Sequence, residues 1–275
     1  MSSPAKRLAA LGLSAKKSLG QHFLHDQAIV RRICDVASIP PNATVVEIGP
    51  GLGTLTIELA KHADSVIALE KDSDLAKALS HLMPGNVQVQ NTDALEYDPS
   101  SIDGRDYYLV ANLPYNVATA ILRRFLDSTF PPRSCTFMVQ REVADRMVTR
   151  PPEMNILGVA MQFHGHPRIA FRVGRGAFTP PPRVTSSVVH MPVQRRFDLD
   201  QSDLEGFFDM VRAGFSARRK QIKNSLENGG IPDDLVVPIL ESAGIDPASR
   251  PQELDVEDWI AMFQALQQIA PGDQR

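Results

Sequence analysis

The feature that most constrains the fold is a glycine-rich turn between an apolar segment and a predicted helix. Residues 44–48 (Thr-Val-Val-Glu-Ile) predict a short strand, and the turn Gly49-Pro50-Gly51-Leu52-Gly53 follows it at once. Residues 54–62 then have the pattern of a helix. Glycines permit a tight turn and let the backbone approach a ligand closely. The arrangement predicts an α/β domain of the kind that binds nucleotide-like ligands.

The next segments continue this alternation of strands and helices. Further strands are predicted at 65–69, 87–90, 107–111 and 135–139, and helices at 26–38, 72–82, 116–127 and 141–147. Such alternation favours parallel strands joined by right-handed crossovers, a doubly wound sheet. Two later strands, at 168–173 and 185–191, flank the run Pro180-Pro181-Pro182, which must lie in a loop.

From about residue 195 the pattern becomes helical, with helices predicted at 204–217, 219–226, 235–243 and 256–269. The predicted fold class is therefore α/β, a Rossmann-like sheet with a small, all-helical C-terminal domain. We place a basic N-terminal arm at 1–20, the sheet domain at 21–194 and the helical domain at 195–275. The arm is interpreted as flexible rather than as a targeting segment.

Charge is unevenly distributed although the net charge is only −3. Residues 1–32 carry a net +5, residues 154–197 contain no Asp or Glu and six Arg, and residues 212–227 carry a net +4. Residues 228–275 carry a net −7. Long stretches without acidic residues are typical of a surface that meets a polyanion such as RNA.

The cysteine and histidine content predicts neither a disulfide framework nor a metal site. Cys34 and Cys135 lie in apolar surroundings and are interpreted as reduced core residues of a cytoplasmic protein. The pairs His22/His25 and His164/His166 lack a third ligand nearby, so we expect no bound metal. No apolar run approaches the roughly 18–20 residues that span a membrane.

Polar residues follow the predicted strands at the edge where ligands bind in such sheets. Glu70 ends the second strand, where a carboxylate can accept hydrogen bonds from both ribose hydroxyls. Asp93 follows the third strand, where it can accept a hydrogen bond from an adenine amino group. Both positions predict binding of an adenosine-containing ligand.

The motif Asn112-Leu113-Pro114-Tyr115, at the end of the fourth strand, is the most specific chemical signal. The amino nitrogen of adenine is a poor nucleophile because its lone pair is delocalised into the ring. The Asn112 amide oxygen and the carbonyl of Leu113 or Pro114 can accept both amino hydrogens and stabilise the positive charge that develops on methylation. Tyr115 offers an aromatic face for the base. This motif indicates an S-adenosylmethionine-dependent methyltransferase that acts on N6 of adenine.

With these motifs in place, the chain resembles the family of small-subunit ribosomal RNA adenine N6-dimethyltransferases, KsgA/RsmA/Dim1, over roughly residues 16–265. The resemblance is carried by residues 20–24, 47–53, Glu70, Asp93, 112–115, 138–144, 178–184 and 215–226. It implies transfer of two methyl groups from S-adenosylmethionine to each of two adjacent adenines near the 3′ end of 16S-type rRNA. It also implies a role in ribosome biogenesis for a monomer acting on a pre-small-subunit particle, away from any membrane.

Carried over residue by residue, the resemblance implies three groups of site residues. Those that bind the methyl donor are Gln21, His22, Leu24, Gly49, Gly51, Glu70, Asp93, Ala94 and Asn112. Those that hold the target base are Asn112, Pro114 and Tyr115, with Phe178 as a second stacking face. Those that contact RNA from a helical segment are Arg218, Arg219, Lys220 and Lys223.

Other interpretations remain open at this stage. A large-subunit adenine methyltransferase of the macrolide-resistance type shares the 112–115 motif, but the 215–226 segment favours the small-subunit family. A mitochondrial relative that acts in transcription is disfavoured by the N-terminus. A non-catalytic ribosome assembly factor would use the same RNA surface. An NAD-dependent oxidoreductase would explain the glycine turn and leave residues 112–115 unexplained.

Overall fold

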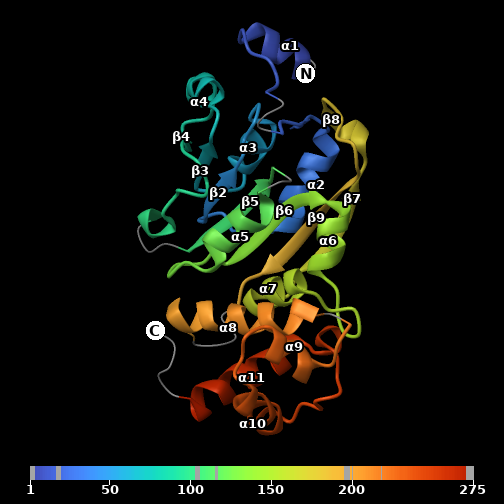
Figure 1. The fold of residues 1–275 in the computed structure, drawn as a ribbon. Coiled ribbons are helices and arrows are strands. Elements are labelled where there is room, and N and C mark those ends of the chain that lie inside the picture. Colours follow the sequence, from blue (N-terminus) through green and yellow to red (C-terminus); the bar gives the residue numbers. More distant parts are fainter. Residues whose placement is uncertain are drawn as a thin grey trace. The chain divides into compact units, whose positions relative to one another are not determined.

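The computed structural model describes residues 4–16, 20–102, 106–114, 117–194, 199, 201–217 and 219–270. It divides into two compact units (Figure 1). Unit 1 comprises residues 1–144 and 167–194, and unit 2 comprises residues 145–166 and 195–275. The expected division had placed residues 145–166 with the sheet, whereas their contacts place them with the C-terminal helices.

Unit 1 is built on a seven-stranded sheet of order β4-β3-β2-β5-β6-β9-β7. Its strands are β2 (Thr44–Ile48), β3 (Ser65–Glu70), β4 (Val87–Asn91), β5 (Tyr107–Asn112), β6 (Ser134–Gln140), β7 (Arg168–Val173) and β9 (Ser186–Pro192). The first five are parallel, as the alternating pattern predicted. The two late strands join antiparallel, β9 to β6 and β7 to β9.

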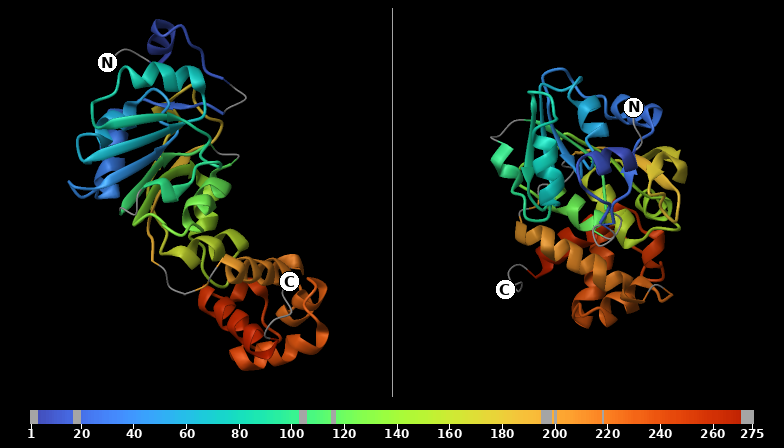
Figure 2. Two further views of the ribbon diagram at one scale, coloured as in Figure 1. Left: turned by 90° about the vertical axis from the view of Figure 1, so that its left-hand side faces the viewer. Right: turned by 90° about the horizontal axis from the view of Figure 1, so that it is seen from above.

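The helices of unit 1 begin and end close to their predicted positions. They are α2 (Gln27–Ala37), α3 (Thr54–Leu59), α4 (Ser73–Ser80), α5 (Ala118–Leu126) and α6 (Arg141–Met147), of which α6 runs into unit 2. The Asp26 side chain caps α2 by accepting from two backbone N–H groups. All five residues of β2 are buried, so both faces of the sheet are covered (Figure 2). This burial fixes the glycine turn at the end of β2.

Several small elements of unit 1 were not predicted from the sequence. Helix α1 (Pro4–Ala10) packs Leu8 into an apolar cluster with Phe23, so part of the N-terminal segment is a docked helix rather than a flexible arm. Strand β1 (Phe23–Leu24) pairs antiparallel with β8 (Phe178–Thr179). Short 3-10 turns lie at η2 (Pro99–Ile102) and η3 (Arg175–Ala177).

Unit 2 is helical, as predicted. It contains α7 (Ile156–His164), α8 (Gln201–Gly214), η4 (Phe215–Ala217), α9 (Ile222–Asn228), α10 (Asp233–Ala243), η5 (Pro251–Glu253) and α11 (Val256–Ile269). Phe163 of α7 lies 4.7 Å from Phe207 of α8, centroid to centroid, which explains why α7 belongs to this unit. A Cβ on Gly214 would lie 2.3 Å from the ring of Trp259, so close packing requires glycine there.

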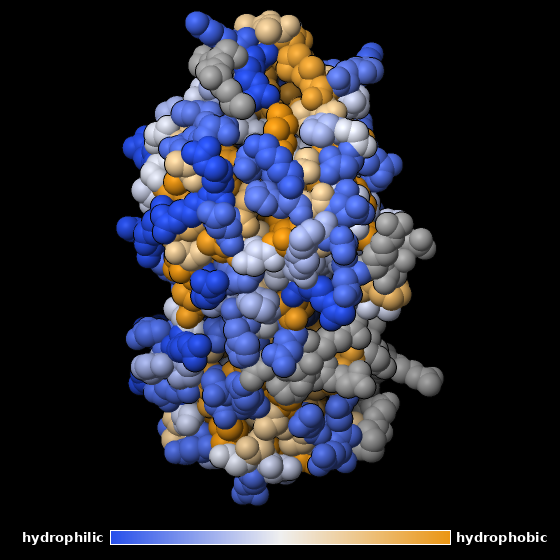
Figure 3. Space-filling model, turned by 180° about the vertical axis from the view of Figure 1, so that it is seen from behind, coloured by the Kyte–Doolittle hydropathy of each residue, from blue (hydrophilic) through white to orange (hydrophobic). Residues whose placement is uncertain are grey.

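Within the part of the chain that the structure describes, no helix has the length and apolar character needed to cross a membrane. On the face seen in Figure 3, hydrophilic residues cover most of the surface and hydrophobic residues show as smaller areas between them.

Candidate active site

A cavity in unit 1 lies where β2, β3 and β5 end. It is lined by the segment around β1, the glycine turn, the end of β3, residues 92–95 and the end of β5. Every residue that the sequence analysis assigned to the methyl donor lines this cavity, and Pro114 does too; the donor set is Gln21, His22, Leu24, Gly49, Gly51, Glu70, Asp93, Ala94 and Asn112. The fold therefore brings together residues far apart in the sequence, such as His22 and Asn112, which are 90 positions apart.

The glycine turn needs its glycines. Gly49, Gly51 and Gly53 have φ of +71°, +57° and +74°, a region that residues with a Cβ seldom adopt. A Cβ on Gly49 would lie 3.3 Å from the Asn112 carbonyl oxygen, and one on Gly51 would lie 3.0 Å from the Phe23 ring. The turn thus keeps its backbone close to both β5 and β1, on the floor of the cavity.

Glu70 is held firmly at the end of β3. Its carboxylate accepts hydrogen bonds from the Gly51 N–H at 3.3 Å and the Asp72 N–H at 2.9 Å. Burial raises the pKa of Glu70, and these two backbone hydrogen bonds oppose the rise. A carboxylate fixed in this way presents its oxygens in one orientation, as recognition of two vicinal hydroxyls requires.

Asp93 is held by an ion pair at the neighbouring edge of the cavity. Its Oδ2 lies 2.6 Å from Lys71 Nζ, and its Oδ1 accepts from the Leu95 N–H at 3.1 Å. The hydrogen bond from Lys71 is the main cause that lowers the pKa of Asp93, so the group is ionised at neutral pH. An ionised carboxylate can accept a hydrogen bond from an amino group.

Asn112 ends β5 with its amide group oriented by the backbone of the residue before β1. Its Nδ2 donates to the His22 carbonyl oxygen at 3.3 Å. His22 in turn donates from Nδ1 to the Pro180 carbonyl oxygen at 2.8 Å, which links the segment before β1 to the proline-rich loop. The amide oxygen is the only acceptor of the Asn112 side chain, and the hydrogen bond made by Nδ2 fixes its orientation.

The structure describes one of the two expected stacking residues. Tyr115 lies outside the described residues. Phe178 is 2% exposed and belongs to a core cluster with Leu24, Val30 and Val188. It pairs with Leu24 across the β1–β8 ladder, one residue from the cavity lining, and does not line the cavity itself.

The expected RNA-contacting residues lie in unit 2. Arg218 is outside the described residues, while Arg219 and Lys220 are exposed in a turn. The sequence had placed this run in a helix, but α9 begins only at Ile222, because Gln221 is an extended N-cap. Lys223 lies in α9, 4.0 Å from Glu227.

Sequence reasoning did not single out two further residues of the cavity. Glu47 of β2 is 1% exposed, and burial raises its pKa to about 8. Lys71 follows Glu70 and pairs with Asp93. An acidic residue inside a mostly apolar predicted strand is the sequence signal that could have identified Glu47. Nothing in the sequence distinguishes Lys71 from the other lysines.

Groups of three or more His, Cys, Asp or Glu side chains arranged to hold a metal ion do not occur among the described residues. The cavity instead combines a close glycine backbone, two oriented carboxylates and an amide acceptor. That set fits a ligand with a ribose, an adenine amino group and a flexible tail.

Taken together, the sheet and its cavity define a class I methyltransferase. The ribosomal RNA adenine dimethylase family matches residues 12–268, and the chain belongs to that family. It is therefore an S-adenosylmethionine-dependent rRNA adenine dimethylase.

Relatives make the comparison more specific. The chain is 42% identical over 252 residues to ribosomal RNA small subunit methyltransferase A of Dehalococcoides mccartyi (strain CBDB1), covering 90% of this chain and 87% of that protein. It is 38% identical over 269 residues to the protein of the same name from Bacillus cereus (strain B4264), covering 93% and 92%.

Two solved structures share the fold. The 23S rRNA methyltransferase ErmE superposes with a TM-score of 0.70 at 28% identity, covering 89% of this chain and 99% of that one. A dimethyladenosine transferase from Plasmodium falciparum superposes with a TM-score of 0.76 at 23% identity, covering 90% and 98%.

Proposed function

We propose that this enzyme dimethylates N6 of two adjacent adenines near the 3′ end of 16S-type rRNA, within a small-subunit particle that is still being assembled. The relatives that share 38–42% of its residues over at least 90% of its length are small-subunit methyltransferases by name, which supports this substrate. We further propose that it acts in the cytoplasm as a monomer.

The observation that carries the proposal is the position of Asn112, at the end of β5 and in the wall of the donor cavity. Its amide oxygen and a backbone carbonyl of Leu113 or Pro114 accept the two N6 hydrogens of the target adenine. This draws the nitrogen toward tetrahedral geometry and stabilises its developing positive charge. The N6–CH3 bond would form as the S–CH3 bond breaks, S-adenosylhomocysteine would leave, and the N6 proton would pass to solvent afterwards, so no strong base is required before transfer.

The donor half of the cavity suits S-adenosylmethionine. When bound, this co-substrate supplies an electrophilic methyl group on a sulfonium. Glu70 accepts from its ribose hydroxyls, Asp93 from its adenine amino group, and Gly49 and Gly51 approach its methionine part. Gln21, His22, Leu24 and Ala94 complete the enclosure of the donor site, which the target base enters from the Asn112 side.

The target base must leave its stack to reach the methyl group, which costs a few kcal/mol. Stacking on an aromatic face returns about 1–3 kcal/mol per base. We assign these faces to Tyr115 and Phe178. For Phe178 this requires the ring to leave the core cluster in which it lies, when the base enters.

The test is methylation of purified small subunits that lack the modification. With labelled S-adenosylmethionine, we expect label at two adjacent adenines of the small-subunit rRNA, and none with the Asn112→Ala variant. Large subunits are the matched control. Label confined to large subunits would overturn the substrate assignment.

The second candidate is a large-subunit adenine methyltransferase. The similarity to ErmE, at 28% identity and a TM-score of 0.70, is the observation in its favour. The higher identity to small-subunit enzymes outweighs it. A binding-only assembly factor predicts no label on either subunit, so the same experiment separates all three functions.

A further inference from the structure

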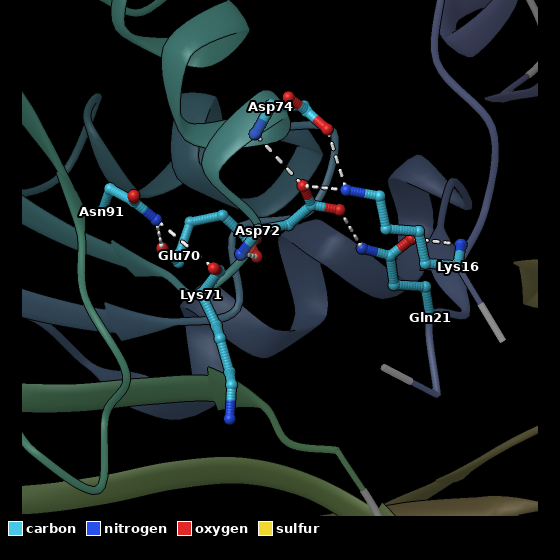
Figure 4. A network of polar contacts seen from close by, with 7 residues as sticks. All are labelled: Lys16, Gln21, Glu70, Lys71, Asp72, Asp74 and Asn91. Carbon is cyan, nitrogen blue, oxygen red and sulfur yellow. Dashed lines mark hydrogen bonds and ion pairs between the residues drawn. The ribbon is translucent and has the colours of Figure 1, made fainter. Parts of the chain in front are cut away.

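Asp72 is a buried carboxylate to which the proposed mechanism gives no role. The residue is 3% exposed, directly after Lys71 and at the N-cap of α4. Its Oδ1 lies 2.7 Å from Lys16 Nζ and accepts from the Asp74 N–H at 3.1 Å, while Oδ2 accepts from Gln21 Nε2 at 3.0 Å (Figure 4). Both oxygens are therefore satisfied, as a buried charge requires.

Two side-chain partners of Asp72, Lys16 and Gln21, come from the N-terminal segment that precedes β1. Lys16 also contacts Asp74, at 2.9 Å, and its backbone N–H donates to Gln21 Oε1 at 2.8 Å. Burial by itself raises the pKa of Asp72, but the hydrogen bonds from Lys16 and Gln21 outweigh it and hold the pKa below its ordinary value. The N-terminal segment thus keeps this carboxylate ionised.

Asp72 also contacts the donor site through its backbone. Its N–H donates to Glu70 Oε1, and the other Glu70 oxygen accepts from the Gly51 N–H. The side-chain contacts of Asp72 fix the backbone of the same residue, at φ −76° and ψ 108°. Any loosening of Asp72 is therefore transmitted directly to the Glu70 carboxylate.

Helix α1, at the beginning of the N-terminal segment, contacts the glycine turn. The guanidinium of Arg7 donates to the Leu52 carbonyl oxygen and to Thr54 Oγ1. Leu8 packs in one apolar cluster with Leu52. Residues 4–16 consequently contact two parts of the chain beside the donor site, the glycine turn through α1 and the N-terminus of α4 through Lys16.

We propose that Lys16 and Asp72 are positioning residues of the donor site, whose ion pair fastens the N-terminal segment and sets the orientation of Glu70. The inference rests on the proposed use of this cavity for S-adenosylmethionine. It assigns Lys16, a basic residue in a basic N-terminus, to donor binding rather than to RNA.

The test compares Lys16→Met, Lys16→Arg and Lys77→Met by calorimetric titration with S-adenosylmethionine. Lys16→Met weakens donor affinity by about three- to tenfold, because Lys16 is 40% exposed and its ion pair is partly screened. Lys16→Arg retains most of the affinity. Lys77→Met, which removes an exposed lysine from α4 without touching the pair, leaves it unchanged.

A purely structural role would not give this pattern. For Lys16→Met we expect a higher KM for the donor, with kcat at saturating donor and KM for RNA near those of the wild type. Combining it with Asp72→Asn gives a loss smaller than the sum of the two single losses, because both remove one interaction.

Three results would overturn the inference. These are unchanged donor affinity in Lys16→Met, an equal loss in Lys77→Met, and weakened RNA binding with normal donor binding. Failure of the wild-type protein to bind S-adenosylmethionine would instead refute the proposed function, so the two failures are distinguishable.

Discussion

At the scale of single residues, Glu70 and Asp93, which we propose bind different parts of the donor, are themselves held by different contacts. Glu70 is fixed by backbone N–H groups, Asp93 by Lys71. We expect Glu70→Ala and Asp93→Ala each to weaken S-adenosylmethionine binding roughly 10- to 150-fold, the cost of losing a charge-assisted hydrogen bond. Calorimetric titration measures this, with the exposed Glu142→Ala as control. Unchanged affinity in both variants would show that the donor binds elsewhere.

Glu47 makes stability depend on pH. Burial raises its pKa from 4.5 to about 8 in the folded protein. Between these values the folded state binds more protons than the unfolded state, so the free energy of unfolding falls as pH rises from about 4.5 to about 8 and levels off above. The fall attributable to Glu47 is at most about 5 kcal/mol.

The matching variant is Glu47→Gln, which keeps the shape of the side chain and cannot ionise. Denaturant titrations from pH 5 to about 8.5 should show a shallower fall for Glu47→Gln than for the wild type. Burial also raises the pKa of Glu70, and the charge of Glu70 is one cause of the raised pKa of Glu47. The difference between the two proteins therefore reports on Glu47 together with its coupling to Glu70. Equal pH dependence in the two proteins would contradict the assignment.

At the scale of elements, β8 contains Phe178, which packs in the core and is also proposed to stack on the target adenine. Phe178→Ala removes a ring that is 2% exposed and should lower the free energy of unfolding by about 3–5 kcal/mol. Phe178→Leu keeps an apolar side chain and should retain most of the stability and donor affinity. If the ring stacks on the base, this variant loses methyl transfer roughly ten- to a hundredfold, and Phe178→Tyr restores much of it. A fully active Phe178→Leu enzyme would leave Phe178 with a packing role only.

The elements also show what could be predicted from the sequence. Strands β2 to β6 carry long apolar runs or alternating patterns and lie where the sequence placed them, which is why all the predicted donor residues meet in one cavity. Strands β1 and β8 are two residues long and form only by pairing with each other, so no local pattern marks them. Helix α1 is likewise stabilised by the packing of Leu8 rather than by its own sequence. The contacts of Lys16 with Asp72 join residues 56 positions apart, which sequence periodicity cannot reveal.

At the scale of the whole molecule, a net charge of −3 conceals basic regions that suit an RNA partner. In unit 1, Arg172, Arg175 and Arg183 are exposed within a stretch that has no acidic residue. In unit 2, Arg219 and Lys220 are exposed in the turn before α9. Each unit thus offers its own positive surface, whereas the donor cavity belongs to unit 1 alone.

The donor residues lie in unit 1 and the 218–220 run in unit 2. The last prediction uses this difference: Arg218, Arg219 and Lys220 are replaced together by alanine. RNA binding should weaken, and the log–log dependence of RNA affinity on salt should become shallower, because each lost phosphate contact removes about 0.7–0.9 from the slope. Filter binding to small-subunit rRNA over a range of salt concentrations measures the slope. Donor affinity should stay at the wild-type value, since the donor residues all lie in unit 1.

The charge-conserving exchange of the three residues, Arg to Lys and Lys to Arg, should keep the wild-type slope, because phosphate attraction depends mainly on charge. An unchanged slope in the alanine variant would remove this turn from the RNA surface and leave the arginines of unit 1 as the remaining candidates.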